Sequence, residues 1–114
     1  MSIDDRFAVV RVPFPFTDRQ VQKRRPALVL SPPGFQQGCG HLLLAMITSA
    51  RQSAWPLDWP IVDLTAAGLP QACVVRLKLF TLDERLVLGR LGALGPDDRD
   101  GVVAQLAKLL PNGS

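Results

Sequence analysis

The segment KRRPALVLS, from Lys23 to Ser31, sets three cationic side chains directly against a short apolar run. The run 27–30 has the length and residue types of a buried strand. Pro26 has no N–H to donate, so we expect it at the first position of that strand and not in its middle. Arg25 precedes this proline and is therefore biased toward extended geometry. The segment predicts a stiff strand with the Arg25 guanidinium at its mouth, where a planar, permanent charge suits a phosphate.

The rest of the chain predicts a mainly β structure. Apolar runs separated by proline, glycine and polar residues indicate further strands at 7–12, 41–48, 60–64, 73–82 (with a bend near Arg76) and 87–91. For 41–48 a helix is an open alternative, because leucine, alanine and methionine favour helices. Residues 35–40 are expected to form a polar turn, and 65–68 at most a helical turn that glycine ends.

A final helix is expected to begin at Gly95-Pro96-Asp97-Asp98, since proline fits a first turn and acidic residues favour the positive helix end. Apolar residues then recur at helical spacing: Val102, Val103, Leu106, Leu109 and Leu110. Short strands followed by one amphipathic helix predict a small curled sheet or barrel with a helix packed on it. With 114 residues and 47% hydrophobic content, residues 1–114 are expected to form a single domain.

The charge distribution predicts a polyanion or an acidic protein segment as partner. The net charge is +3, and four basic residues with no acidic one lie between Arg19 and Arg25. Cys39 and Cys73 have neither metal-ligand spacing nor a disulfide framework, which favours reduced thiols in a cytosolic protein. No apolar run approaches the ~20 residues of a membrane span, and the acidic N-terminus is not a signal peptide. We therefore expect a cytoplasmic protein with no membrane association.

Arg25 and Thr48 are the main candidates for chemistry. From the residues alone, Arg25 is either a phosphate ligand or an ordinary solvated cation. Thr48 ends its predicted strand, where a hydroxyl can bond a phosphate or simply a nearby backbone group. His41, the only histidine, starts the same strand and is expected to be structural. The acidic residues are scattered, so neither a metal nor a cofactor is expected.

Further residues are candidates for contacts with RNA. A cleft is expected where the strand of Thr48 ends, with Arg19, Lys23, Arg24 and Arg51 beside it as phosphate contacts. Lys78 would either reach this cleft or face solvent, and exposed aromatic side chains can stack on single-stranded bases. The candidates are Arg19, Lys23, Arg24, Ser49, Arg51, Trp55 and Lys78, with Phe16 as a second possible stacking residue. For Trp55, stacking on RNA and packing in a core or a dimer interface are about equally expected. For Trp59, packing in a core or a dimer interface is favoured.

The ordered motifs resemble the MazF/PemK family of toxin ribonucleases over nearly the whole chain. The resemblance lies in RRPALVLS at 24–31, AMITS at 45–49, GLP at 68–70, VV at 74–75, KLFTLD at 78–83 and LGAL at 91–94. The chain departs from many members in two places. It has Phe7-Ala8 where they have Gly-Asp, and Lys78-Leu79-Phe80-Thr81 where they have Gln-Ile-Arg-Thr. Phe80 thus replaces an arginine, and the difference is expected either to shift target preference or to weaken RNA binding.

The resemblance implies a small SH3-like barrel with a C-terminal helix, usually a homodimer. It implies a metal-independent, sequence-selective endoribonuclease for single-stranded RNA, with Arg25 and Thr48 catalytic and Ser49 in support. The products would carry a 2′,3′-cyclic phosphate and a 5′-hydroxyl. The implied partner is an antitoxin with an acidic, disordered tail, and DNA binding would occur through the toxin–antitoxin complex. The alternatives are a non-catalytic SH3-like module that binds nucleic acid or peptide, and a structural dimer subunit without a ligand.

Overall fold

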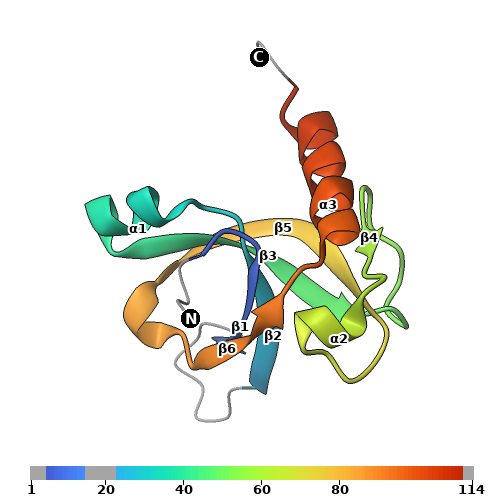
Figure 1. Ribbon diagram of the computed structural model, residues 1–114, viewed down its shortest axis with the longest axis horizontal. Coiled ribbons are helices and arrows are strands. Elements are labelled where there is room, and N and C mark those ends of the chain that lie inside the picture. The colour runs from blue at the N-terminus through green and yellow to red at the C-terminus, as the bar shows by residue number, and fades with distance from the viewer. Residues whose placement is uncertain (1–4, 15–22, 112–114) are drawn as a thin grey trace.

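The computed structural model describes residues 5–14 and 23–111 and shows a curled sheet with a helix beside one edge (Figure 1). Six strands pair antiparallel in the order β4-β5-β3-β2-β1-β6. The strands are β1 Ala8–Phe14, β2 Lys23–Val29, β3 His41–Ser49, β4 Trp59–Pro60, β5 Cys73–Asp83 and β6 Gly89–Ala93. The helices are α1 Pro33–Cys39, α2 Leu64–Ala67 and α3 Pro96–Leu109, with a 3-10 turn at Glu84–Leu86. The mainly β class with a C-terminal helix is confirmed.

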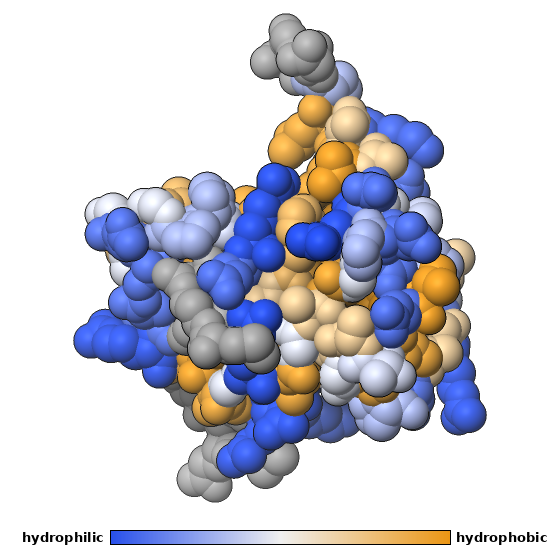
Figure 2. Space-filling view, viewed as in Figure 1, coloured by the Kyte–Doolittle hydropathy of each residue, from blue (hydrophilic) through white to orange (hydrophobic). Residues whose placement is uncertain are grey.

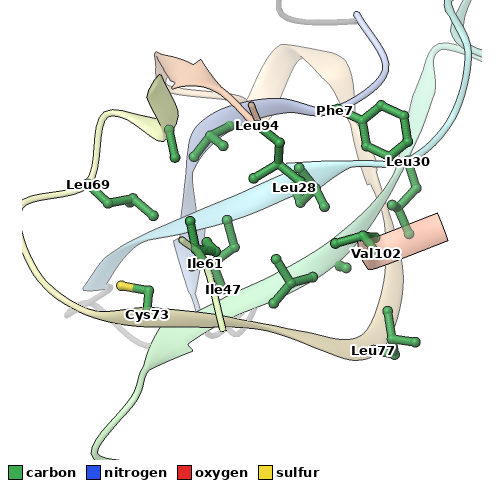
Figure 3. Close-up of a cluster of buried hydrophobic side chains, with 14 residues drawn as sticks. Phe7, Leu28, Leu30, Ile47, Ile61, Leu69, Cys73, Leu77, Leu94 and Val102 are labelled. Carbon is green, nitrogen blue, oxygen red and sulfur yellow. The ribbon is translucent and has the colours of Figure 1, made fainter. Parts of the chain in front are cut away.

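Apolar side chains are buried on both faces of the sheet. Successive residues of a strand point to opposite faces, so Val9 and Val10 belong to different clusters. The larger core (Figure 3) contains Phe7, Val9, Leu28, Leu30, Ala45, Ile47, Ile61, Ala67, Leu69, Cys73, Val75, Leu77, Leu94 and Val102. The smaller core contains Ala8, Val10, Val12, Ala27, Val29, Leu42, Leu44 and Leu82. The curl therefore lets one six-stranded sheet bury two apolar surfaces.

The two longest strands, β3 and β5, follow the sequence prediction. Residues 41–49 form a central strand and not a helix, since they pair with β2 on one side and β5 on the other. The expected bend in β5 is present as a bulge: Ala45 pairs with Leu79, whereas the next residue, Met46, pairs with Arg76. Two residues of β5 are therefore accommodated between consecutive pairs, which bends the strand.

The strand expected at 60–64 is wrong beyond Pro60. The backbone N–H groups of Val62 and Asp63 donate to the two carboxylate oxygens of Asp98, each at 2.9 Å. Asp98 was expected only as an acid favouring the helix start, but it is 1% exposed and satisfies two backbone donors that would otherwise need a strand neighbour. The chain then enters α2, which Gly68 ends as predicted.

Two further predictions differ in detail. The polar turn expected at 35–40 is the short helix α1, which begins at Pro33 and ends in a left-handed glycine, Gly40. The strand expected at 87–91 lies two residues later, as β6. The chain first reaches β1 at Leu88, whose backbone N–H donates to the carbonyl of Arg11, and regular pairing follows from Gly89. The first error concerns the type of element and the second only its ends, which are the least certain part of an assignment.

Gly68 fixes the distance between α2 and β6. Its φ is +71°, and a Cβ atom there would lie 2.0 Å from the carbonyl oxygen of Leu91. Only glycine allows this approach, because any side chain would collide with backbone that cannot move independently. The segment that follows Gly68 is thereby placed over one end of the sheet.

Candidate active site

The central strands β2 and β3 separate at one end of the sheet, and Pro26 explains why. It was expected at the first position of its strand, but β2 begins three residues earlier, at Lys23. The N–H of Leu30 donates to Leu43 of β3, so even-numbered residues of β2 direct their N–H groups toward β3. Pro26 falls in this set and has no N–H, and the β2–β3 pairing ends beside it at Ala27–Met46.

Each strand continues to pair on its other side. β2 remains paired with β1 up to Lys23 opposite Phe14, and β3 remains paired with β5 up to Ser49 opposite Cys73. The two strands therefore form a fork, open between residues 24–26 of one strand and 47–49 of the other. The proline that was predicted to stiffen the strand also opens the sheet.

A pocket of about 330 Å³ occupies this fork. Its wall comes from both strands, from Arg11 of β1, from Leu91 of β6 and from the segment after α2. The lining residues are Arg11, Arg24, Arg25, Pro26, Ile47, Thr48, Ser49, Gly68, Leu69, Pro70, Gln71, Cys73 and Leu91. Within residues 5–14 and 23–111, this lining contains three arginines and no acidic residue, so the described part of the wall is positively charged at neutral pH.

Arg25 and Thr48 lie across the fork from each other. Counting on from the last pair, Ala27–Met46, places residue 25 opposite residue 48, and both line the pocket. The Arg25 Nε atom is buried and has no hydrogen-bond partner within residues 5–14 and 23–111. Burying a charged donor without a partner costs about 1–3 kcal/mol or more. The guanidinium as a whole keeps a permanent positive charge, which an anion in the fork would meet.

The alternation of side chains divides the pocket between the two faces of the sheet. Alternate residues of a strand share a face, so Arg25 lies on the same face as Ala27, and Thr48 on the same face as Met46. This is the face of the smaller core. Arg24 and Ser49 alternate with these residues and therefore lie on the opposite face, that of the larger core. The fork therefore joins two cationic surfaces around the end of the sheet.

Arg11 and Cys73 complete the larger-core side of the pocket. Arg11 was not among the residues predicted from the sequence. A signal was present, because Arg11 is a charged residue between Val10 and Val12 and lies on the same face of β1 as the buried Val9. Burial raises the pKa of the Cys73 thiol, so it stays protonated and is a poor nucleophile at neutral pH.

Trp55 lies outside the pocket, on a loop fastened to β5. Arg76 forms an ion pair with Asp58 at 3.0 Å and donates to the carbonyl of Ser53, while the backbone N–H of Trp55 donates to the Asp58 carboxylate. The indole is 43% exposed, with the Arg76 guanidinium 5.7 Å and the Lys78 ammonium 5.5 Å from a ring centroid. A flat aromatic surface with cations around it is suited to stacking on a base beside its phosphate.

The other candidates are placed as follows. Lys23 and Arg51 are exposed and do not line the pocket, whereas Arg24 and Ser49 do. Arg19 and Phe16 lie outside the described residues. His41 stands at the far end of β3 from Thr48, opposite Asp83.

Two classes of feature are not found in the part of the chain that the structure describes. Residues 5–14 and 23–111 contain no group of three or more histidine, cysteine, aspartate or glutamate side chains placed to hold a metal ion. Over the same ranges, none of the helices has the length and apolarity needed to cross a membrane.

Comparison with known proteins gives the family. A model for the PemK-like, MazF-like toxin of type II toxin–antitoxin systems matches residues 5–110. The chain belongs to this toxin family. No match was found among curated protein sequences. As expected for a MazF-like chain, its fold is found in solved MazF structures, and the resemblance inferred from the sequence motifs is confirmed.

Three solved structures illustrate the match to the MazF fold. A MazE–MazF complex from Deinococcus radiodurans has 25% identity and a TM-score of 0.75, with 96% of this chain and 97% of that chain covered. MazF alone from the same organism has 26% identity and a TM-score of 0.72, covering 96% and 98%. A mycobacterial endoribonuclease in complex with its cognate antitoxin has 16% identity and a TM-score of 0.72, covering 96% and 95%, and shows the fold alone.

Proposed function

We propose that this MazF-like chain is a metal-independent endoribonuclease that cuts single-stranded RNA at the fork between β2 and β3. The observation that carries the proposal is that Arg25 and Thr48 come opposite each other in the strand register and line one pocket. Among the lining residues that the structure describes, none is acidic. A permanently charged, planar guanidinium opposite a hydroxyl is suited to binding a phosphate.

In the proposed reaction the RNA supplies its own nucleophile. The 2′-hydroxyl attacks the adjacent phosphorus, and the bond from phosphorus to the 5′-oxygen of the next nucleotide breaks. Arg25 neutralises the charge that develops on the phosphate oxygens. Thr48 donates a hydrogen bond and relays a proton toward the leaving oxygen. The products are a 2′,3′-cyclic phosphate and a 5′-hydroxyl, with the 2′-hydroxyl proton balancing the one gained by the leaving group.

We propose that RNA approaches across Trp55 and the basic residues around the fork. Lys23, Arg24 and Arg51 offer phosphate contacts at the end of the sheet, and Trp55 with Lys78 offers a stacking surface. Arg19 belongs to the same proposal, although it lies outside the described residues.

The proposed protein partners are an antitoxin and a second copy of this chain, in the cytoplasm. The two complexes described above contain an antitoxin, and a basic pocket suits an acidic tail that folds on binding. Apolar side chains gather along the outward-running part of α3 (Figure 2), where Val103, Leu109 and Leu110 are exposed. A second protein chain that covered this stripe would stabilise it by removing apolar surface from water.

The second candidate is a non-catalytic SH3-like module that binds nucleic acid or peptide, favoured by the exposed Trp55 beside two cations. One experiment separates the two. The purified protein is incubated with a defined transcript in excess chelator, and the ends of the fragments are mapped. We expect cuts at a few fixed sites with 2′,3′-cyclic phosphate ends. Salt-sensitive binding without cuts would support the module instead.

A further inference from the structure

The loop between β3 and β4 carries a polar network that the proposed cleavage step does not use. At its centre is Asp58, whose side chain is only 16% exposed. Both of its carboxylate oxygens accept from Arg76, with Nε 3.2 Å from one oxygen and Nη2 3.0 Å from the other. Arg76 also donates to the carbonyl of Ser53. A planar guanidinium that is bonded at two atoms and largely shielded from water holds the carboxylate in one geometry.

The same carboxylate fixes the turn that carries Trp55. The backbone N–H of Trp55 donates to the Asp58 carboxylate at 3.1 Å, and the backbone N–H of Asp58 donates to the carbonyl of Trp55 at 3.2 Å. Pro56 and Leu57 lie between them, and Leu57 has a φ of +65°. Glycine usually occupies a position of positive φ after the proline of a turn, so this turn is strained. The bonds made by Asp58 hold it in that conformation.

The register of β5 places this network on the face of the catalytic candidates. Arg76 pairs with Met46, two residues before Thr48 on β3, and paired residues of neighbouring strands share a face. Arg76 therefore lies on the same face of the sheet as Arg25 and Thr48. The exposed Trp55 indole, which lies against the Arg76 guanidinium, is presented beside them.

We propose that Asp58 is a positioning residue: held by Arg76, it fixes the Trp55 indole where a base flanking the cut stacks. The inference rests on the proposed function for the path of RNA across Trp55. A stacking surface that is ordered before RNA arrives loses less conformational entropy on binding than a free loop would. Asp58 also neutralises the charge of Arg76, so its contribution to RNA binding comes from geometry and opposes the effect of its charge.

Charge and positioning predict opposite effects of Asp58→Ala on RNA binding. Removing an acid from a basic surface strengthens binding by charge alone, whereas releasing the indole weakens it. The probe is a fluorescent 2′-O-methyl RNA hexamer, selected from a randomised pool as a tight binder; it has no free 2′-hydroxyl and is not cut. We expect anisotropy to show ~5-fold weaker binding for Asp58→Ala. The control is Asp97→Ala, an exposed acid on α3, which should bind no more weakly than wild type.

Combining the change with Trp55→Ala shows whether Asp58 acts through the indole. We expect Trp55→Ala alone to weaken hexamer binding ~10-fold, and Asp58→Ala to have no further effect in that background, because no indole remains to be positioned. An equal effect of Asp58→Ala with and without Trp55 would give Asp58 a merely structural role and overturn the proposal. Unchanged or tighter binding by Asp58→Ala alone would also overturn it.

Fluorine NMR of protein labelled with fluorotryptophan reports the position of the indole directly. In Asp58→Ala the Trp55 resonance should move toward that of free fluorotryptophan, whereas the resonance of Trp59, which is bonded to Asp98, should not move. Arg76→Lys keeps the charge but cannot bond both carboxylate oxygens, so it should move the Trp55 resonance in the same direction and weaken hexamer binding. A Trp55 resonance that moves in neither variant would contradict the positioning role. The expected coupling in a protein that cuts no RNA would retain that role and reject the nuclease.

Discussion

The indole Nε1 of Trp59 donates a 2.9 Å hydrogen bond to the carboxylate of Asp98, which is buried in the first turn of α3. Asp98 also accepts the backbone N–H groups of Val62 and Asp63. One carboxylate thus fastens α3 to the segment between β4 and α2. Because that segment leads through α2 to the wall of the fork pocket, Asp98 supports the site from a distance.

The first prediction concerns this carboxylate. Asp98→Ala removes the acceptor of three partly buried donors, so we expect a loss of about 2–4 kcal/mol in the free energy of unfolding. Urea denaturation measures it. The control is Asp97→Ala, in the same turn but exposed, which should cost at most about 1 kcal/mol through the helix dipole. Similar losses for the two variants would contradict the role given to Asp98.

The second prediction concerns Gly101, one turn further along α3. A Cβ atom there would lie 2.2 Å from the Trp59 ring, which its bond to Asp98 holds in place. Gly101→Ala should therefore destabilise the protein by about 1–3 kcal/mol, although alanine favours helices. Gly38→Ala in α1, where a Cβ meets nothing within 4 Å, should be neutral or stabilising in the same denaturation assay. A stabilised Gly101→Ala variant would show that the ring is free to move.

The third prediction tests the origin of the fork. Pro26→Ala restores an N–H directed at β3, so the ladder should extend toward residues 25 and 48 and narrow the pocket. We expect the amide at position 26 to exchange slowly with deuterium by NMR, and RNA cleavage to fall ~10-fold through misplacement of Arg25. Pro33→Ala, exposed in α1, is the control. Exchange at the solvent rate at position 26 would mean that something other than the proline separates the strands.

The sequence predicted most of the strands around the candidate site, because a strand is indicated by a short local pattern of apolar residues. The apolar runs placed Arg25 and Thr48 at the ends of two strands, and the family motifs related them. The pocket itself was not predicted, because it depends on which neighbour the Pro26 nitrogen faces, and that requires the pairing of three strands. The role of Asp98 was missed because its partners, Trp59, Val62 and Asp63, are distant in the chain and no adjacent residue indicates them. For Arg11 the neighbouring valines did give a signal, but the pocket it lines depends on strands that are distant in the chain.

The fourth prediction concerns Trp55 and follows from the proposed RNA path. Trp55→Ala should weaken the binding of a single-stranded 2′-O-methyl RNA by about 1–3 kcal/mol, because a base loses its stacking surface. The indole is exposed, so the free energy of unfolding should change little. Phe35→Ala, an exposed aromatic residue of α1, is the matched control. Unchanged affinity in Trp55→Ala would remove this residue from the RNA path.

The central claim is that Arg25 acts on the scissile phosphate. The measurement is the single-turnover rate of RNA cleavage in chelator by wild type, Arg25→Ala and the exposed control Arg99→Ala, with urea denaturation of each variant. We predict at least a ~100-fold slower rate for Arg25→Ala, with stability unchanged or raised because a buried unpartnered donor is removed, and no change for Arg99→Ala. A stable Arg25→Ala protein that cuts RNA at the wild-type rate would contradict the account.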